Sequence, residues 1–485
     1  MPSVAVKPEP SRPEAGGWLG PVLAIVAAVT AARVLALAFD RTDLFVDEAQ
    51  YWLWGQRFDF GYYSKPPLIG WLIRAVTDLA GSSAPFWVRL PAPVLHGLTG
   101  GILAALAARI AGRGAAIWTA ALYVTLPFTA VGSAMISTDT VMAPLFAGGM
   151  LFFWRLGESR RAGDALALGL CAGFAFMAKY VALFLPAGIV LAVLVAPARR
   201  IGWGNALLAV LAFALVIAPN VAWNVTHQFA TLEHTMDNVG RVREGESAGL
   251  NWGSMGGWLA AQIAVFGPVT MGAMILGVLR ARTAERRVLA ALTLPPLVVV
   301  TGQALLEKAY ANWAVSAYLA GVILAVLVLP RWGRWLALLA NLVAVTAVAA
   351  LTVLAPWPAP GGKPLLNRYL GRTELSRRIL ALATAEGVPV YTNDRDILAD
   401  LFYTGRDAGV TIYAPRPVGR PMNYYEQNFP LPDGFAGPIL VIRRSPIDCG
   451  AGPVPPAGML NGSGTWEGKG VTPYVVPGEC LNAAP

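Results

Sequence analysis

The feature that most constrains this chain is the recurrence of apolar runs of about 20 residues, the length that crosses a bilayer as a helix. Residues 20–37, GPVLAIVAAVTAARVLAL, form the first run, and others follow along the chain as far as residue 355. Only 13% of the 485 residues are charged, against about 25% in soluble proteins. The sequence therefore predicts a polytopic α-helical membrane protein.

The arrangement of the apolar runs predicts about eleven transmembrane helices, at residues 18–39, 86–108, 114–134, 138–156, 164–180, 181–197, 205–222, 256–279, 288–306, 312–330 and 334–355. The runs 164–180 and 181–197 are nearly continuous, so a re-entrant pair is the alternative there. Every second gap is rich in arginine, and these gaps contain Arg109/Arg113, Arg155/Arg160/Arg161, Arg199/Arg200, Arg280/Arg282/Arg286/Arg287 and Arg331/Arg334. Such gaps are cytoplasmic by the positive-inside rule. The tail, residues 1–17, is then cytoplasmic, and residues 40–85, 134–138, 179–181, 223–255 and 307–312 face outward.

The net charge of +9 is explained by these short gaps, so it does not indicate a basic face that binds nucleic acid. After residue 355 the composition changes to that of a soluble protein. A Pro/Gly linker leads into patterns of helices and short strands, which predict a small periplasmic α/β domain over residues 356–485. Cys449 and Cys480 fall in this domain, where both a disulfide and two free thiols are compatible with the sequence.

The first outward segment, residues 40–85 within the transmembrane domain 18–355, is too polar to lie in lipid, and we expect amphipathic helices in it. It contains Asp47 and Glu48, then Lys65 before two prolines, with aromatic residues between them. The aromatic side chains of interest are Tyr51, Tyr62 and Tyr63. Acids in a first helical turn can serve the helix dipole alone, and aromatic residues can form an interfacial belt. Together with the lysine, however, they are typical of a site for an amphiphilic substrate.

Ionisable residues at membrane depth are costly and usually functional. By the predicted topology they all lie at the outer face: Asp139, Lys179, His227, Lys308 and, beside them, the amide of Asn312. Three of them have a simpler explanation, since Asp139 can cap a helix, Lys179 can extend to the interface and His227 can belong to a loop. Their convergence on one face nevertheless predicts a single extracytoplasmic site.

Carboxylates and lysines in one site suit displacement at the anomeric carbon of a sugar that is linked to a lipid through phosphate. A carboxylate takes the proton of the acceptor hydroxyl, and cations stabilise the charge on the departing phosphate. No general acid is needed, because the phosphate already carries negative charge. Glycoside hydrolysis, in contrast, uses its two carboxylates as acid and base or nucleophile.

Five segments carry a resemblance to a known family: residues 46–72, STDT at 137–140, MAKYVAL at 177–183, WNVTHQF at 223–229 and YANWAVSAYLA at 310–320. They resemble the bacterial glycosyltransferases of GT-C architecture that use polyprenyl-phosphate sugars. This group is similar to lipid A aminoarabinose and galacturonic acid transferases and, more distantly, to protein O-mannosyltransferases. The resemblance implies an inverting transferase in the bacterial inner membrane, with a polyprenyl-phosphate-linked sugar as donor and an envelope lipid, glycan or protein as acceptor.

The resemblance also implies roles for individual residues. Asp47 would be the base or would position the acceptor with Glu48 beside it, Asp139 would complete the acidic site, and Lys65 and Lys179 would bind the donor phosphate. Aminoarabinose transferases have an acid immediately before this lysine, where this chain has Ser64. We therefore predict transfer that requires no metal and no cofactor.

A transporter or lipid flippase is the alternative from a different class. Transporters tend to have repeated halves with broken helices that meet at the bilayer midplane, whereas here the polar residues gather at one face and no repeat is evident. The sequence leaves the sugar open, and lipid A, lipopolysaccharide core, another glycan and protein all remain as acceptors.

Overall fold

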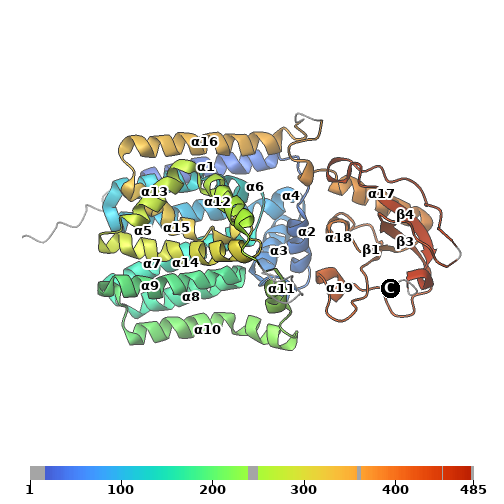
Figure 1. Ribbon diagram of the computed structural model, residues 1–485, viewed down its shortest axis with the longest axis horizontal. Helices are drawn as coiled ribbons and strands as arrows, with labels where there is room; N and C mark the ends of the chain where they lie inside the picture. Colours follow the sequence, from blue (N-terminus) through green and yellow to red (C-terminus); the bar gives the residue numbers. More distant parts are fainter. Residues whose placement is uncertain (1–16, 239–248, 358–361, 451, 482–485) are drawn as a thin grey trace, which may run out of the picture.

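A computed structural model describes residues 17–238, 249–357, 362–450 and 452–481. Apart from Gly17, the predicted tail lies outside the described residues, as do linker residues 358–361. Most of the chain forms a bundle of apolar helices that run along its long axis, with a smaller α/β unit at one end (Figure 1). The bundle contains α1 (Leu19–Ala38), α5 (Pro91–Thr125), α6 (Pro127–Ala134), α7 (Thr138–Ser159), α8 (Ala162–Ala178), α9 (Phe184–Val195), α10 (Trp203–Thr226), α12 (Trp252–Phe266), α13 (Pro268–Leu279), α14 (Ala284–Leu306), α15 (Ala317–Val328) and α16 (Arg331–Val353).

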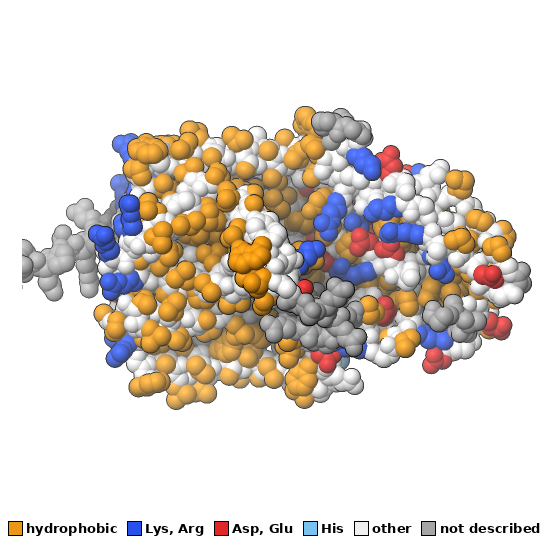
Figure 2. All heavy atoms as spheres, in the orientation of Figure 1, with side chains coloured by type: hydrophobic (Ala, Val, Ile, Leu, Met, Phe, Trp, Pro, Cys, Tyr) orange, Lys and Arg blue, Asp and Glu red, His pale blue; other side chains and the backbone are white. Residues whose placement is uncertain are grey.

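The centre of the bundle is α15, whose residues from Ala317 to Val326 are all buried. In contrast, α1, α10 and α16 bury little of their apolar surface within the protein. A helix that is apolar all round and exposed on the outside of a bundle is suited to contact with lipid. Figure 2 shows this apolar surface over the bundle, with Lys and Arg side chains gathered at the end away from the α/β unit.

Most of each predicted span is helical, but the predicted spans 114–134 and 256–279 are each divided between two helices, and the number of eleven spans is not confirmed. Among the described residues, six helices are long and apolar enough to cross a membrane, or seven if the bent pair α12–α13 is one span. Several predicted spans are instead short helices, namely α8, α9 and α15. The bend of 107° between α12 and α13 lies at Gly267, whose φ of +83° favours glycine, and Pro268 begins the next helix.

Three short helices lie between the bundle and the α/β unit (Figure 1): α2 (Val46–Gly55), α3 (Leu68–Ala80) and α4 (Pro85–Arg89). The prediction of amphipathic helices fits α3, which buries one face through Ile69 and Ile73. It is wrong for α2, where every residue except Asp47 is buried. The α/β unit covers the side of α2 that would otherwise meet water, because α18 packs on it.

The α/β unit contains α17 (Arg372–Glu386), α18 (Arg395–Thr404), α19 (Tyr424–Asn428) and a sheet of four strands. The strands are β1 (Val390–Thr392), β2 (Ile412–Tyr413), β3 (Pro438–Arg443) and β4 (Thr472–Pro477), in the order β2-β1-β3-β4. The central strand β1 is parallel to β2 and β3, with Val390 opposite Ile412 and Leu440, and β4 is antiparallel to β3. Cys449 and Cys480 form a disulfide, which answers the question that the sequence left open.

Candidate active site

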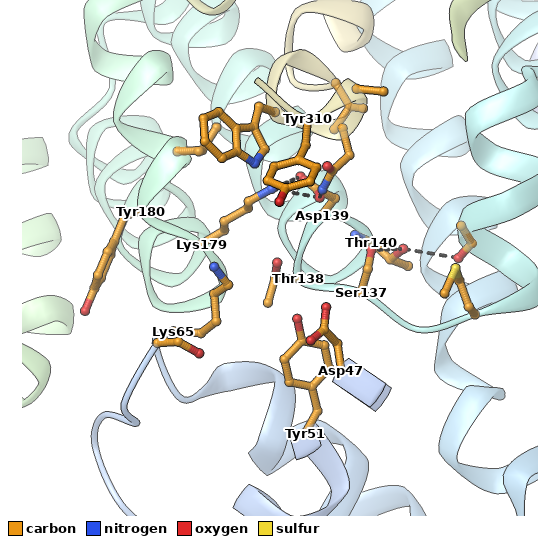
Figure 3. Close-up of a pocket in the computed structure, with 18 of the residues that line it drawn as sticks. Asp47, Tyr51, Lys65, Ser137, Thr138, Asp139, Thr140, Lys179, Tyr180 and Tyr310 are labelled. Carbon is orange, nitrogen blue, oxygen red and sulfur yellow. Dashed lines mark hydrogen bonds and ion pairs between the residues drawn. The ribbon is translucent and has the colours of Figure 1, made fainter. Parts of the chain in front are cut away.

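A cavity of about 1330 Å³ lies where the bundle, α2 and the α/β unit meet. Its polar walls come from α2, the segment before α3, the start of α7 and the break between α8 and α9. Figure 3 shows side chains from these separate elements converging on one space, with Asp47 and Tyr51 on one side and Lys65 and Lys179 on another. Segments that are distant in sequence are therefore neighbours here.

Asp47 is the one partly exposed residue of α2, and it faces this space (Figure 3). Its Oδ1 accepts a hydrogen bond of 2.6 Å from Arg395, which also donates to Gln50 on the next turn of α2. No hydrogen bond to Oδ2 is found among the described residues, so this oxygen can accept a proton from a bound molecule. Asp47 thus has one oxygen that fixes its orientation and one oxygen that is available for chemistry.

Asp139 and Lys179 form a nearly buried ion pair at the base of the cavity. The Lys179 ammonium donates to both carboxylate oxygens of Asp139, at 2.7 and 2.8 Å, and Asn312 donates to Oδ2 at 2.8 Å. Ser137, rather than Asp139, caps α7, so the capping explanation is wrong for Asp139. Lys179 is buried and follows the last residue of α8, and its ammonium is directed to Asp139.

Lys65 reaches the same space from the segment before α3 (Figure 3). No ion-pair or hydrogen-bond partner of its ammonium is found in the described part of the chain. Burial lowers the pKa of Lys65 to about 8, and Lys179 lowers it as well, against the opposing charges of Asp47 and Asp139. A partly buried cation without a partner among the described residues is well placed to bind an anion.

The environment of Glu48 corrects the prediction that this residue is catalytic. Although it lines the cavity wall, the residue is fully buried, and both its oxygens are occupied. Arg89 donates to Oε1 at 3.0 Å and to Oε2 at 2.7 Å, while the backbone N–H groups of Ile136 and Phe45 donate to Oε1 and Oε2. With its charge paired and its lone pairs used, Glu48 holds α2 against the bundle and cannot serve as a base.

The predicted tyrosines have different environments. Tyr51 and Tyr63 line the cavity, and burial, with Asp47 next, raises the pKa of Tyr51, so its hydroxyl stays protonated. Tyr62 does not line it, because its ring stacks on Trp54 at 4.9 Å and its hydroxyl donates to the backbone of Trp54 and Arg57. Tyr62 is therefore part of the packing of this segment.

His227 and Lys308 also lie outside the cavity lining, unlike Asn312. His227 is exposed and stacks on Trp223 at 4.1 Å, and Lys308 is exposed above the ring of Tyr310. Two other histidines line the cavity, His96 on α5 and His234 on the short helix α11 (Ala230–Asn238). Burial and then Lys65 lower the pKa of His234 to about 4, so His234 is neutral near pH 7.

The sequence interpretation missed several cavity residues. The most important are Arg395 and Arg368, which come from the α/β unit and from the segment before it. Burial opposes the charge of Arg395, but Asp47 keeps the pKa of its guanidinium above the usual value. Arg395 begins α18 and is separated by two residues from the end of β1, and the carboxyl ends of parallel strands are common positions for binding residues. That position is the signal from which Arg395 could have been found.

The rest of the cavity is apolar and extends between helices of the bundle. Its lining side chains belong to α6, α9, α12 and α14 and include Phe128, Val131, Phe184, Val265 and Val299. One continuous space therefore has a charged end and an apolar end. Within the described residues, no group of three or more His, Cys, Asp or Glu side chains could hold a metal ion, and metal-independent transfer stays a prediction.

Comparisons with known proteins show the family of this chain. Residues 64–223 match the family model described as dolichyl-phosphate-mannose-protein mannosyltransferase. Over 471 residues the chain is 41% identical to the lipid A galacturonosyltransferase RgtD of Rhizobium johnstonii, a match that covers 95% of this chain and 98% of that protein. The chain belongs to the GT-C glycosyltransferase family. The resemblance predicted from the five motifs is confirmed.

Solved structures of another GT-C protein have the same fold. ArnT from Cupriavidus metallidurans in the apo state gives a TM-score of 0.61 at 16% identity, over 87% of this chain and 92% of that one. The structure of the same protein bound to undecaprenyl phosphate gives a TM-score of 0.62 at 15% identity, over 88% of this chain and 93% of that one. As a GT-C glycosyltransferase, the chain is not expected to be a transporter or flippase.

Proposed function

We propose that this enzyme transfers a galacturonosyl residue from a polyprenyl-phosphate donor to a lipid A acceptor, with inversion at the anomeric carbon. The observation that carries the proposal is one cavity that joins Asp47, Lys65 and Lys179 to an apolar arm between membrane helices. It occurs in a chain that is 41% identical to a lipid A galacturonosyltransferase over nearly its whole length. A polyprenyl-phosphate sugar has the same division into a charged end and an apolar end.

In the proposed mechanism, Asp47 is the general base. Its free Oδ2 takes the proton of the acceptor hydroxyl, and the acceptor oxygen forms a bond to the anomeric carbon of the sugar. The bond between that carbon and the phosphate oxygen breaks, and its electron pair stays on the phosphate. Arg395 keeps the other oxygen of Asp47 in place, at 2.6 Å, which favours one orientation of the base.

Lys65 and Lys179 are the proposed ligands of the donor phosphate. An ammonium has three N–H donors; Lys179 uses two of them on Asp139, which leaves one for the phosphate. Asp139 therefore acts through Lys179, and Asn312 holds Asp139 in turn. Charge that develops on the leaving phosphate is stabilised by donors that are already oriented.

We place the cavity and the α/β unit on the periplasmic side of the bacterial inner membrane and the N-terminus in the cytoplasm. Two observations support this orientation. The basic side chains of the bundle lie at the end away from the α/β unit (Figure 2), as expected for a cytoplasmic face. The disulfide between Cys449 and Cys480 suits an oxidising compartment.

The test is mass spectrometry of lipid A and of the other envelope glycans from a deletion strain. We expect the deletion to remove one galacturonosyl residue from lipid A alone. The mass of lipid A should fall by about 176 Da, the mass of one hexuronosyl residue. The intact gene should restore this residue, and a gene with Asp47→Asn should not. Loss of the sugar from core glycan or protein, with lipid A unchanged, would contradict the proposed acceptor, and loss of a neutral sugar would contradict the proposed donor.

A further inference from the structure

Among the described residues, four cationic side chains line the cavity, and two of them are already paired. Arg395 is bound to Asp47 and Lys179 is bound to Asp139. Lys65 and Arg368 also line the cavity, and neither has an ion-pair partner among the described residues. A ligand with two separate anionic groups would satisfy both of these cations.

Arg368 contacts the residue that precedes α2, the helix that carries the proposed base. Its guanidinium lies over the ring of Phe45, 4.8 Å from the centroid, and Tyr369 packs against the same ring at 5.2 Å. Phe45 directly precedes α2 and stands two residues before Asp47. The backbone N–H of Asp43 donates to the carbonyl of Tyr369 at 2.9 Å, which ties this segment to the start of α2.

We infer that Arg368 binds the carboxylate of the transferred sugar and so selects uronosyl over neutral hexosyl donors. The inference rests on the proposed function, in which the donor carries a phosphodiester and a uronate. Lys65 is assigned to the phosphate, next to Lys179. Among the described residues this leaves Arg368 as the unpaired cation of the cavity, in contact with the segment that leads into α2 and Asp47. A planar guanidinium matches a carboxylate through two parallel N–H donors.

The experiment compares two donors that differ only in this group, polyprenyl-phosphate galacturonose and polyprenyl-phosphate galactose. Purified full-length enzyme is tested as wild type, Arg368→Gln, Arg368→Lys and the control Lys363→Gln, which changes an exposed cation of the same segment. Transfer to lipid A gives kcat/KM for each donor. If galactosyl transfer is too slow to follow, that donor is measured as a competitive inhibitor.

We expect Arg368→Gln to lower kcat/KM for the galacturonosyl donor about 10- to 100-fold, as for a lost hydrogen-bonded charge contact. Values for the galactosyl donor should change less than about twofold, Arg368→Lys should recover part of the loss, and Lys363→Gln should resemble wild type. Unchanged galacturonosyl transfer in Arg368→Gln would overturn the inference. An equal loss with both donors would also overturn it, and would assign Arg368 to the donor phosphate or to an acceptor phosphate.

Acceptors with and without phosphate groups separate those two outcomes, because a contact to an acceptor phosphate disappears with the dephosphorylated lipid. The results that would contradict the proposed function differ from those that would contradict the role of Arg368. A wild-type enzyme that transfers sugar from neither donor would contradict the transferase proposal itself, and preference of the wild type for the galactosyl donor would contradict the uronosyl assignment before any variant is made.

Discussion

The lowered pKa of Lys65 predicts how donor use depends on pH. Burial and Lys179 bring this pKa to about 8 in the free enzyme, so the ammonium is about 90% protonated at pH 7 and about 10% at pH 9. If only the protonated form binds the donor phosphate, kcat/KM for the donor falls about tenfold between these values, because this parameter reports the free enzyme. A bound phosphate favours the cation, so kcat itself should decline only at higher pH.

The assay is initial-rate transfer from polyprenyl-phosphate galacturonose to lipid A at saturating acceptor, from pH 6.5 to 9.5. Lys65→Arg keeps the positive charge over this whole range, since arginine stays protonated. In this variant the decline of kcat/KM at high pH, the basic limb of the profile, should disappear even if the maximal rate is lower. Lys363→Arg is the matched control and should keep the limb. A decline centred near pH 8 that persists in Lys65→Arg would refute the assignment of Lys65 to the phosphate.

Three further predictions concern the architecture around the cavity. Glu48→Gln leaves the buried charge of Arg89 short of its main partner and should destabilise the protein by about 3 kcal/mol, measured by thermal unfolding in detergent. Arg420→Gln removes the ion pairs between the α/β unit and α11, and amide exchange in α11 should rise about fivefold. Cys480→Ser opens the bridge to Cys449, which spans 31 residues, and should lower the free energy of unfolding by about 3 kcal/mol. For each variant, an unchanged unfolding stability or exchange rate would contradict the corresponding prediction.

Much of the candidate site could be predicted because membrane burial makes its charges conspicuous. Lys179 and Asp139 stand out from apolar surroundings, and the structure pairs them across 40 residues of sequence. Asp47 and Glu48 could not be distinguished in this way. Consecutive residues on a helix point in different directions, so one carboxylate faces the cavity and the other faces Arg89, and only the tertiary packing decides which.

Other features depend on contacts that no local pattern encodes. Arg395 meets Asp47 across 348 residues, and Arg368 reaches the cavity from the short segment between the linker and α17, in which the sequence predicts no site residue. The fold class and the approximate position of most apolar helices followed from hydropathy, but the breaks within the predicted spans 114–134 and 256–279 and the number of spans did not. Hydropathy marks apolar stretches, whereas helix length and breaks such as that at Gly267 are set by backbone geometry and packing.

The most direct test is transfer by purified Asp47→Asn enzyme, with donor binding measured on the same sample. Removing a general base should lower kcat at least about 100-fold, while folding and affinity for polyprenyl-phosphate galacturonose remain close to wild type, because the asparagine side chain can still accept from Arg395. Turnover near the wild-type rate in this variant would contradict the role of Asp47 as the base.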